Sequence, residues 1–92
     1  MIERVKLGDV AAFSGISPDK SIALKPLEEA AEVFGAWQLW DLVRAPYEKD
    51  KLLDECADVI QATCNLLAAF GVTDMTEAMS ACERRNGERG RL

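Results

Sequence analysis

The chain has 92 residues, of which 49% are apolar, and its formal net charge at pH 7 is −5. This length fits one domain, residues 1–92, which buries a modest share of its surface and often gains stability by oligomerising. The acidic balance argues against a nucleic-acid polymer as partner. The chain starts with no long apolar run and contains no stretch of transmembrane length, so we expect neither a signal peptide nor a membrane span.

The cysteines and the absence of histidine narrow the chemistry further. Cys56, Cys64 and Cys82 form no CxxC pair, and there is no histidine. This argues against a structural zinc site and removes His-based catalytic triads and Glu-x-x-His di-iron bundles. Cys56 and Cys64 are eight residues apart on one apolar helix side, where they are expected to be small core residues. The set fits a reducing, cytoplasmic environment.

Residues 1–20 form a weakly patterned leading segment. Residues 5–13 fit a short helix, with Asp9 near its start, and residues 14–19 contain the Ser, Gly and Pro of a turn. A long helix should follow, with Pro26 in its first turn. It should end near Val43 or Arg44, because Pro46 disfavours helix at the preceding residue.

Two carboxylates of this first long helix point into its apolar side. Projection at about 100° per residue places Glu29 beside Ala36 and Trp40, and Glu32 between Leu39 and Val43. Gln38 and Asp41 fall on the opposite side. The apolar residues spread over more than half of the circumference, which indicates that a second subunit covers part of the helix.

A second long helix is predicted from a cap at Asp50 to about Phe70, with Gly71 ending it. Its link to the first helix is short, so the two should be antiparallel neighbours. Glu55 borders the apolar face of this helix, and Asp58 comes next on the same side.

Glu29, Glu32, Glu55 and Asp58 thus form two acidic pairs aimed inward. Partly buried carboxylates that lie close together repel one another, so they need protonation, basic partners or a bound cation. All-oxygen ligands suit a hard ion such as Mg²⁺, with Mn²⁺ as a substitute. Any one of these residues alone would be read as an ordinary solvated helix glutamate.

The last helix should start near Thr73 or Asp74, where Asp74 and Glu77 resemble a capping box, and should fray by residues 86–87. Residues 83–92 carry four arginines, which suit either phosphate contacts or a solvated tail. Lys25 has the same two readings. Trp37 and Trp40 fit a core or dimer interface better than a platform for stacking a base.

The spacing of these residues resembles a known superfamily. Lys25-x-x-Glu28-Glu29-x-x-Glu32 is followed after 22 residues by Glu55-x-x-Asp58, and later by Asn86-x-x-Arg89-Gly90. Over roughly residues 22–91 the chain resembles the MazG-like all-α nucleoside triphosphate pyrophosphohydrolases, which include dimeric dUTPases, dCTP pyrophosphatases and phosphoribosyl-ATP pyrophosphohydrolase.

The resemblance implies an all-α antiparallel bundle of about four helices, two of them long and acidic, completed in a homodimer or homotetramer. It implies Mg²⁺-dependent cleavage of a nucleoside triphosphate between the α- and β-phosphates, giving a monophosphate and pyrophosphate. The residues carried over by position are Glu29, Glu32, Glu55 and Asp58 as metal ligands, Glu28 and Glu32 as catalytic carboxylates, and Lys25, Asn86 and Arg89 as phosphate contacts. Trp37, Trp40 and Asn65 are candidates for the base pocket, with Trp40 taken as substrate-binding.

Two other interpretations remain open from the sequence. One is a non-catalytic helical module that binds nucleotide or Mg²⁺, which would bind nucleotide tightly without releasing pyrophosphate. The other is a structural interaction domain, whose thermal stability would not change when Mg²⁺ or nucleotide is added.

Overall fold

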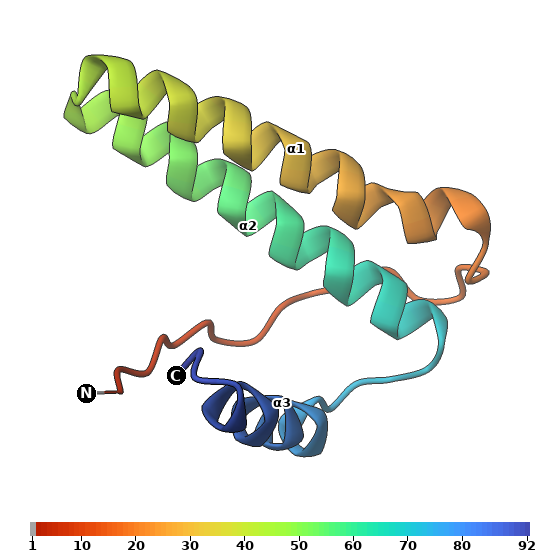
Figure 1. Ribbon diagram of the computed structural model, residues 1–92. Helices are drawn as coiled ribbons and strands as arrows, with labels where there is room; N and C mark the ends of the chain where they lie inside the picture. The colour runs from red at the N-terminus through yellow and green to blue at the C-terminus, as the bar shows by residue number, and fades with distance from the viewer. Residues whose placement is uncertain (1) are drawn as a thin grey trace.

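The computed structural model describes residues 2–92 and contains three helices preceded by an extended segment (Figure 1). Helices α1 (Lys20–Val43) and α2 (Pro46–Ala69) lie side by side as an antiparallel hairpin, whereas α3 (Thr76–Glu88) lies apart, below the end of α2. The described residues contain no strand, so the predicted all-α class is confirmed.

Helix α1 begins earlier than predicted because Asp19 caps it. The Asp19 carboxylate accepts hydrogen bonds from the Ile22 N–H at 3.2 Å and from the Ser21 hydroxyl at 2.7 Å. The Ser21 hydroxyl, followed by the Ile22 N–H, also lowers the Asp19 pKa. Pro26, expected in the first turn, therefore lies inside the helix, where its missing N–H removes one backbone bond to the turn before it.

The connection between α1 and α2 is very short. Arg44 adopts the left-handed conformation with φ 58°, and its N–H donates to the Trp40 carbonyl at 2.7 Å. Ala45 is extended and Pro46 opens α2, since its fixed φ suits a first helical position. The prediction that Asp50 caps α2 is therefore wrong, because the helix starts four residues before it.

Helices α2 and α3 both end in the same hydrogen-bonding motif. After α2, the Val72 N–H donates to the Leu67 carbonyl at 3.0 Å and the Gly71 N–H to Ala68 at 2.9 Å, a Schellman arrangement. Gly71 has φ 76°, as this motif requires. The predicted stop at Gly71 is confirmed.

Helix α3 starts after an Asp74 turn, in which the Asp74 carboxylate accepts from the Thr76 N–H at 2.9 Å. Its end is capped like that of α2, because the Arg91 N–H donates to the Asn86 carbonyl at 2.8 Å. The helix therefore reaches Glu88 instead of fraying by residues 86–87 as predicted.

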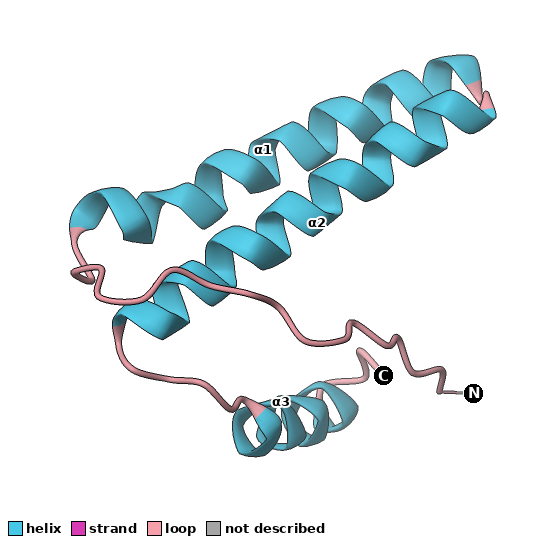
Figure 2. Ribbon diagram, turned by 180° about the vertical axis from the view of Figure 1, so that it is seen from behind, coloured by secondary structure: helices cyan, strands magenta, loops and turns pink. Residues whose placement is uncertain are grey.

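The leading segment is extended, so the predicted helix over residues 5–13 is wrong, and residues 2–92 form three helices in place of about four. Gly8 takes φ 78°, which interrupts any helix there. Two side chains of α2 bind the segment instead: Gln61 Nε2 donates to the Ala11 carbonyl at 2.8 Å, and Asn65 Oδ1 accepts from the Phe13 N–H at 3.4 Å. The segment consequently runs past α2 (Figure 2).

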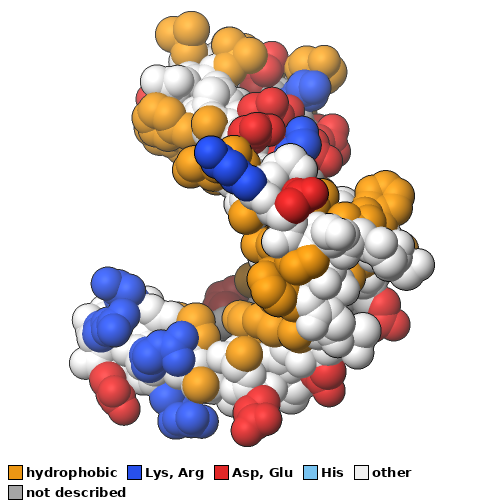
Figure 3. All heavy atoms as spheres, turned by 90° about the vertical axis from the view of Figure 1, so that its right-hand side faces the viewer, with side chains coloured by type: hydrophobic (Ala, Val, Ile, Leu, Met, Phe, Trp, Pro, Cys, Tyr) orange, Lys and Arg blue, Asp and Glu red, His pale blue; other side chains and the backbone are white. Residues whose placement is uncertain are grey.

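A single copy of the chain has almost no core. Ala62, 7% exposed, is the one buried residue among those described. Helix α1 exposes large apolar side chains, with Leu27 69%, Phe34 58% and Leu42 81% exposed. The radius of gyration is 15.3 Å, against about 12 Å for a compact chain of this length. Figure 3 shows the resulting concavity, with apolar side chains on its wall and basic ones on its lower arm.

None of the helices in the described part of the chain is apolar enough over a sufficient length to cross a membrane.

The turn at Gly71 offers a test of the helix ends. We expect Gly71→Ala to destabilise the fold by about 1–2 kcal/mol, because a Cβ is strained at positive φ. Gly35→Ala is the control, since Gly35 lies inside α1, where alanine should stabilise by about 0.5–1 kcal/mol. Urea denaturation followed by circular dichroism measures both, and equal stability of the Gly71 variant and the wild type would contradict the motif.

Candidate active site

The hairpin brings three of the predicted carboxylates together. Glu29 and Glu32 are three residues apart on one face of α1, and Glu55 faces them from α2. Carboxylate oxygens from these three side chains all lie within 4.8 Å of one another. Because the turn centres on Arg44, Glu32 and Glu55 are almost equally far along the chain from it, which places them opposite each other. We call Glu29, Glu32 and Glu55 the acid cluster.

The electrostatics of the acid cluster are unfavourable without a counter-ion. Burial raises the pKa of Glu29, and the charges of Glu32 and then Asp58 raise it further, against a smaller opposing effect of Lys25. The pKa of Glu55 is also raised, first by burial and then by Glu32 and Asp58. Ionising these groups at neutral pH therefore costs free energy in the isolated chain.

One buried oxygen of the acid cluster could serve as a metal ligand. Oε2 of Glu55 is buried and has no hydrogen-bond partner among the described residues. A buried acceptor without a partner is costly. Together with the clustered oxygens, it fits a site for a hard divalent cation, whose preferred ligands are carboxylates.

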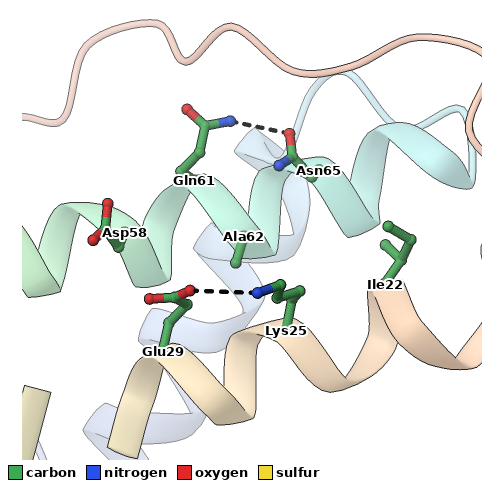
Figure 4. Close-up of a pocket in the computed structure, with 7 residues that line it drawn as sticks. All are labelled: Ile22, Lys25, Glu29, Asp58, Gln61, Ala62 and Asn65. Carbon is green, nitrogen blue, oxygen red and sulfur yellow. Dashed lines mark hydrogen bonds and ion pairs between the residues drawn. The ribbon is translucent and has the colours of Figure 1, made fainter. Parts of the chain in front are cut away.

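Asp58 lies beside the acid cluster and shares a hollow with Glu29. This hollow, of about 260 Å³, lies between the two helices, with Lys25 and Ala62 also in its wall. Figure 4 shows the Lys25 ammonium directed toward Glu29, and the two groups form an ion pair at 4.0 Å. We call this hollow between the two helices the polar hollow, because an ammonium, carboxylates and amides line part of its wall.

Ile22, Gln61 and Asn65 form the rest of the wall of the polar hollow, and the two amides bind each other. Gln61 Nε2 donates to Asn65 Oδ1 at 3.0 Å (Figure 4), and the two side chains also hold the leading segment. Asn65, a predicted base-pocket candidate, therefore positions the chain's own backbone. The spacing of four residues on one helix face was the available sequence signal for such a pair.

A second hollow flanks the acid cluster on the side nearer the α1–α2 turn. It has a volume of about 420 Å³ and is reached by Glu32 and Glu55 at one end. The remainder of its wall combines Gly35, Ala36 and Leu39 of α1 with Tyr47, Glu48 and Lys51 of α2. We call it the aromatic hollow. Sequence reasoning missed Tyr47 and Lys51, although they lie eight and four residues before Glu55 and so on its helix face.

The remaining predicted site residues lie outside the acid cluster. The Glu28 side chain is 59% exposed and pairs with Lys25 at 3.4 Å. Trp40 lies toward the α1–α2 turn, where the Arg44 guanidinium covers its ring at 4.3 Å. Asn86 and Arg89 belong to the end of α3, which does not pack on α1 or α2. The Asn86 amide donates to the Cys82 carbonyl at 3.0 Å.

A curated relative matches most of the chain. Over 86 residues, the chain is 36% identical to the phosphoribosyl-ATP pyrophosphatase of Cereibacter sphaeroides strain KD131, and the match covers 88% of this chain and 82% of that protein. The chain belongs to the phosphoribosyl-ATP pyrophosphatase family. The predicted enzyme class, a hydrolase acting on phosphoric anhydrides, is thereby confirmed. No model of a known family matches the chain, and no solved structure does.

The acid cluster should lower the free energy of unfolding of this protein when no metal ion is bound. An acid whose pKa is raised on folding contributes stability below its ordinary pKa and loses it as the pH rises. We expect Glu55→Gln to melt at a higher temperature than the wild type at pH 7 in chelator. The difference should vanish below the ordinary glutamate pKa of 4.5.

Thermal melts followed by circular dichroism at both pH values measure this effect. Asp54→Asn is the matched control, since Asp54 is exposed on the same helix, and should leave the melting temperature unchanged. A wild type that is as stable as the Glu55 variant at pH 7 would show that the acid cluster carries no electrostatic cost.

Proposed function

We propose that the protein is a divalent-cation-dependent pyrophosphohydrolase that cleaves phosphoribosyl-ATP between its α- and β-phosphates. The observation that carries the proposal is the acid cluster between α1 and α2, with its unpartnered Glu55 oxygen, in a member of the phosphoribosyl-ATP pyrophosphatase family. The products would be a nucleoside monophosphate and pyrophosphate. Other nucleoside triphosphates are further candidate substrates, because they carry the same triphosphate chain, which is the group that reacts.

Glu29, Glu32, Glu55 and Asp58 would hold Mg²⁺, or Mn²⁺ as a substitute. When bound, such an ion neutralises the polyphosphate and lowers the pKa of a bound water. Asp58 belongs with the cluster because its charge acts on both Glu29 and Glu55. The acids that destabilise the isolated chain would thereby become a favourable site for substrate and cation together.

The side chains around the acid cluster have separate tasks. Lys25 faces the polar hollow beside Glu29, where its ammonium can contact a phosphate oxygen. A water adds across the phosphoanhydride bond, and a carboxylate accepts its proton. Glu32 is better placed for this than Glu28, because Glu32 lies within the cluster. Glu28 pairs with Lys25 and so orients the Lys25 ammonium. The alternative is that Glu28, in place of Glu32, accepts the proton.

A second copy of the chain would complete the fold and the phosphate contacts. The exposed apolar face of α1 carries a stacked pair, Phe34 and Trp37, with ring centroids 5.9 Å apart. An exposed face of this kind is typical of an oligomer interface. Asn86 and Arg89, on an α3 that does not pack on its own hairpin, would then reach phosphates from the neighbouring copy.

Hydrolysis tests the assignment of the acids. We expect Glu29→Gln and Asp58→Asn each to reduce the release of pyrophosphate from phosphoribosyl-ATP by at least about 100-fold, since a lost ligand forfeits several kcal/mol of charge stabilisation. Helicity should stay unchanged, and chelator should abolish the wild-type reaction. Full activity of either variant at saturating Mg²⁺ would remove that residue from the mechanism, and an inactive wild type would refute the proposed function.

Assembly is a separate measurement. We expect the wild type to sediment as a dimer or tetramer in analytical ultracentrifugation and Phe34→Glu to shift it toward the monomer, because the charge would have to be buried in the interface. Gln38→Glu on the same helix is the control and should leave the assembly intact. A monomeric wild type at micromolar concentration would contradict the interface.

A further inference from the structure

The aromatic hollow stands next to the acid cluster but has no part in the chemistry described so far. It is larger than the polar hollow, about 420 Å³ against 260 Å³, and of these two hollows beside the acid cluster it is the one within the range of about 300–1,000 Å³ that is usual for small-molecule sites. The reacting phosphates must lie at the acid cluster. The nucleoside then extends into one of the two hollows and the pyrophosphate group into the other.

The two hollows differ in what they can bind. The polar hollow offers Lys25, the paired amides of Gln61 and Asn65, and Ile22. This wall gives a base no aromatic surface to stack on. The aromatic hollow offers the Tyr47 ring, 67% exposed, and the apolar Leu39. An aromatic ring left in solvent beside a polar site is suited to stacking on a nucleobase.

We propose that the aromatic hollow is the nucleoside subsite, in which Tyr47 stacks on the adenine and Lys51 contacts the phosphate that stays on the nucleoside. This inference rests on the proposed function and adds the direction in which the substrate lies. The phosphates released as pyrophosphate point the other way, into the polar hollow toward Lys25.

The arrangement along α2 supports the order of these contacts. Tyr47, Lys51 and Glu55 are spaced at intervals of four residues, so they share one face, each about 6 Å along the helix from the next. Lys51 thus lies between Tyr47 and Glu55 along α2, and its charge acts on Glu55. Lys51 makes no ion pair with the described residues, so its charge is available to a phosphate.

The α1 side of the hollow is shaped to admit a flat group. Gly35 and Ala36 contribute no bulk, and a Cβ built at Gly35 would have nothing within 4 Å beyond its own helix. Glu48 adds an acceptor that suits a ribose hydroxyl or the exocyclic amine of adenine. A larger side chain at Gly35 should therefore occupy the space of the nucleoside without disturbing the packing of α1 on α2.

Steady-state kinetics with phosphoribosyl-ATP test the subsite. Loss of a stacking ring is worth about 1–3 kcal/mol per base, so Tyr47→Ala should raise KM about 5- to 150-fold while kcat changes little, and Tyr47→Phe should restore the wild-type KM. Gly35→Leu should raise KM similarly, whereas Gln38→Leu, on the same helix, should not. Lys51→Ala should raise KM, with Lys49→Ala as its control.

Competition by inorganic tripolyphosphate separates the nucleoside subsite from the phosphate site. This probe carries the polyphosphate chain without a nucleoside, so its inhibition constant should be the same for the wild type, Tyr47→Ala and Gly35→Leu. Unchanged KM values in these variants would overturn the subsite. An inhibition constant that rises together with KM, or a dissociated oligomer in Tyr47→Ala, would make the residue structural and overturn it also.

The two proposals fail in different ways. If the wild type produces no nucleoside monophosphate, as followed by ion-exchange chromatography, the proposed function is refuted and the subsite with it. If the wild type is active and tripolyphosphate inhibits it, but the Tyr47 and Gly35 variants keep the wild-type KM, the function stands and the direction of the substrate is wrong.

Discussion

The repulsion among carboxylates between α1 and α2 is the constraint on which the remaining structure depends. Two amphipathic helices of this length would ordinarily bury apolar side chains along their whole contact, yet here Glu29, Glu32 and Glu55 occupy part of it. Burial and the neighbouring charges raise the pKa values of Glu29 and Glu55. The hairpin is therefore less stable alone than its apolar content suggests, and a cation bound at the acid cluster would stabilise it.

The Arg44 turn sets which residues of the two helices face one another. Its left-handed backbone, the extended Ala45 and the helix-starting Pro46 reverse the chain within a very few residues. In an antiparallel hairpin, residues at equal distances from the turn lie opposite each other, so Glu32 meets Glu55 and Glu29 lies across from Asp58. One inserted residue would rotate every α2 side chain by about 100° relative to α1. The acidic pairs depend on the length of this turn as much as on their own spacing.

The same elements explain what the sequence could predict. Helical projection places Glu29 and Glu32 on the apolar side of α1, and the short link implies an antiparallel partner helix. These two signals are enough to predict the acid cluster from the sequence. The helix starts were misplaced because Asp19 and Pro46 act through local hydrogen bonding and preset backbone angles, which an apolar pattern does not register. The leading segment is extended because Gln61 and Asn65, which lie 50 and 52 positions further along the chain than the residues they contact, bind its backbone. No local pattern in residues 5–13 carries that information.

The core is sparse because the chain is short. In this chain of 92 residues, both long helices carry residues of the site, and α3 does not pack on the hairpin that they form. The apolar sector of α1, opposite α2, then has no cover within one copy, and neither does the concavity beside α3 (Figure 3). A second copy can cover both and bring the arginine-rich end of α3 toward a polyphosphate. Because the second copy would supply phosphate contacts that one copy lacks, association and substrate binding should be thermodynamically linked, each favouring the other.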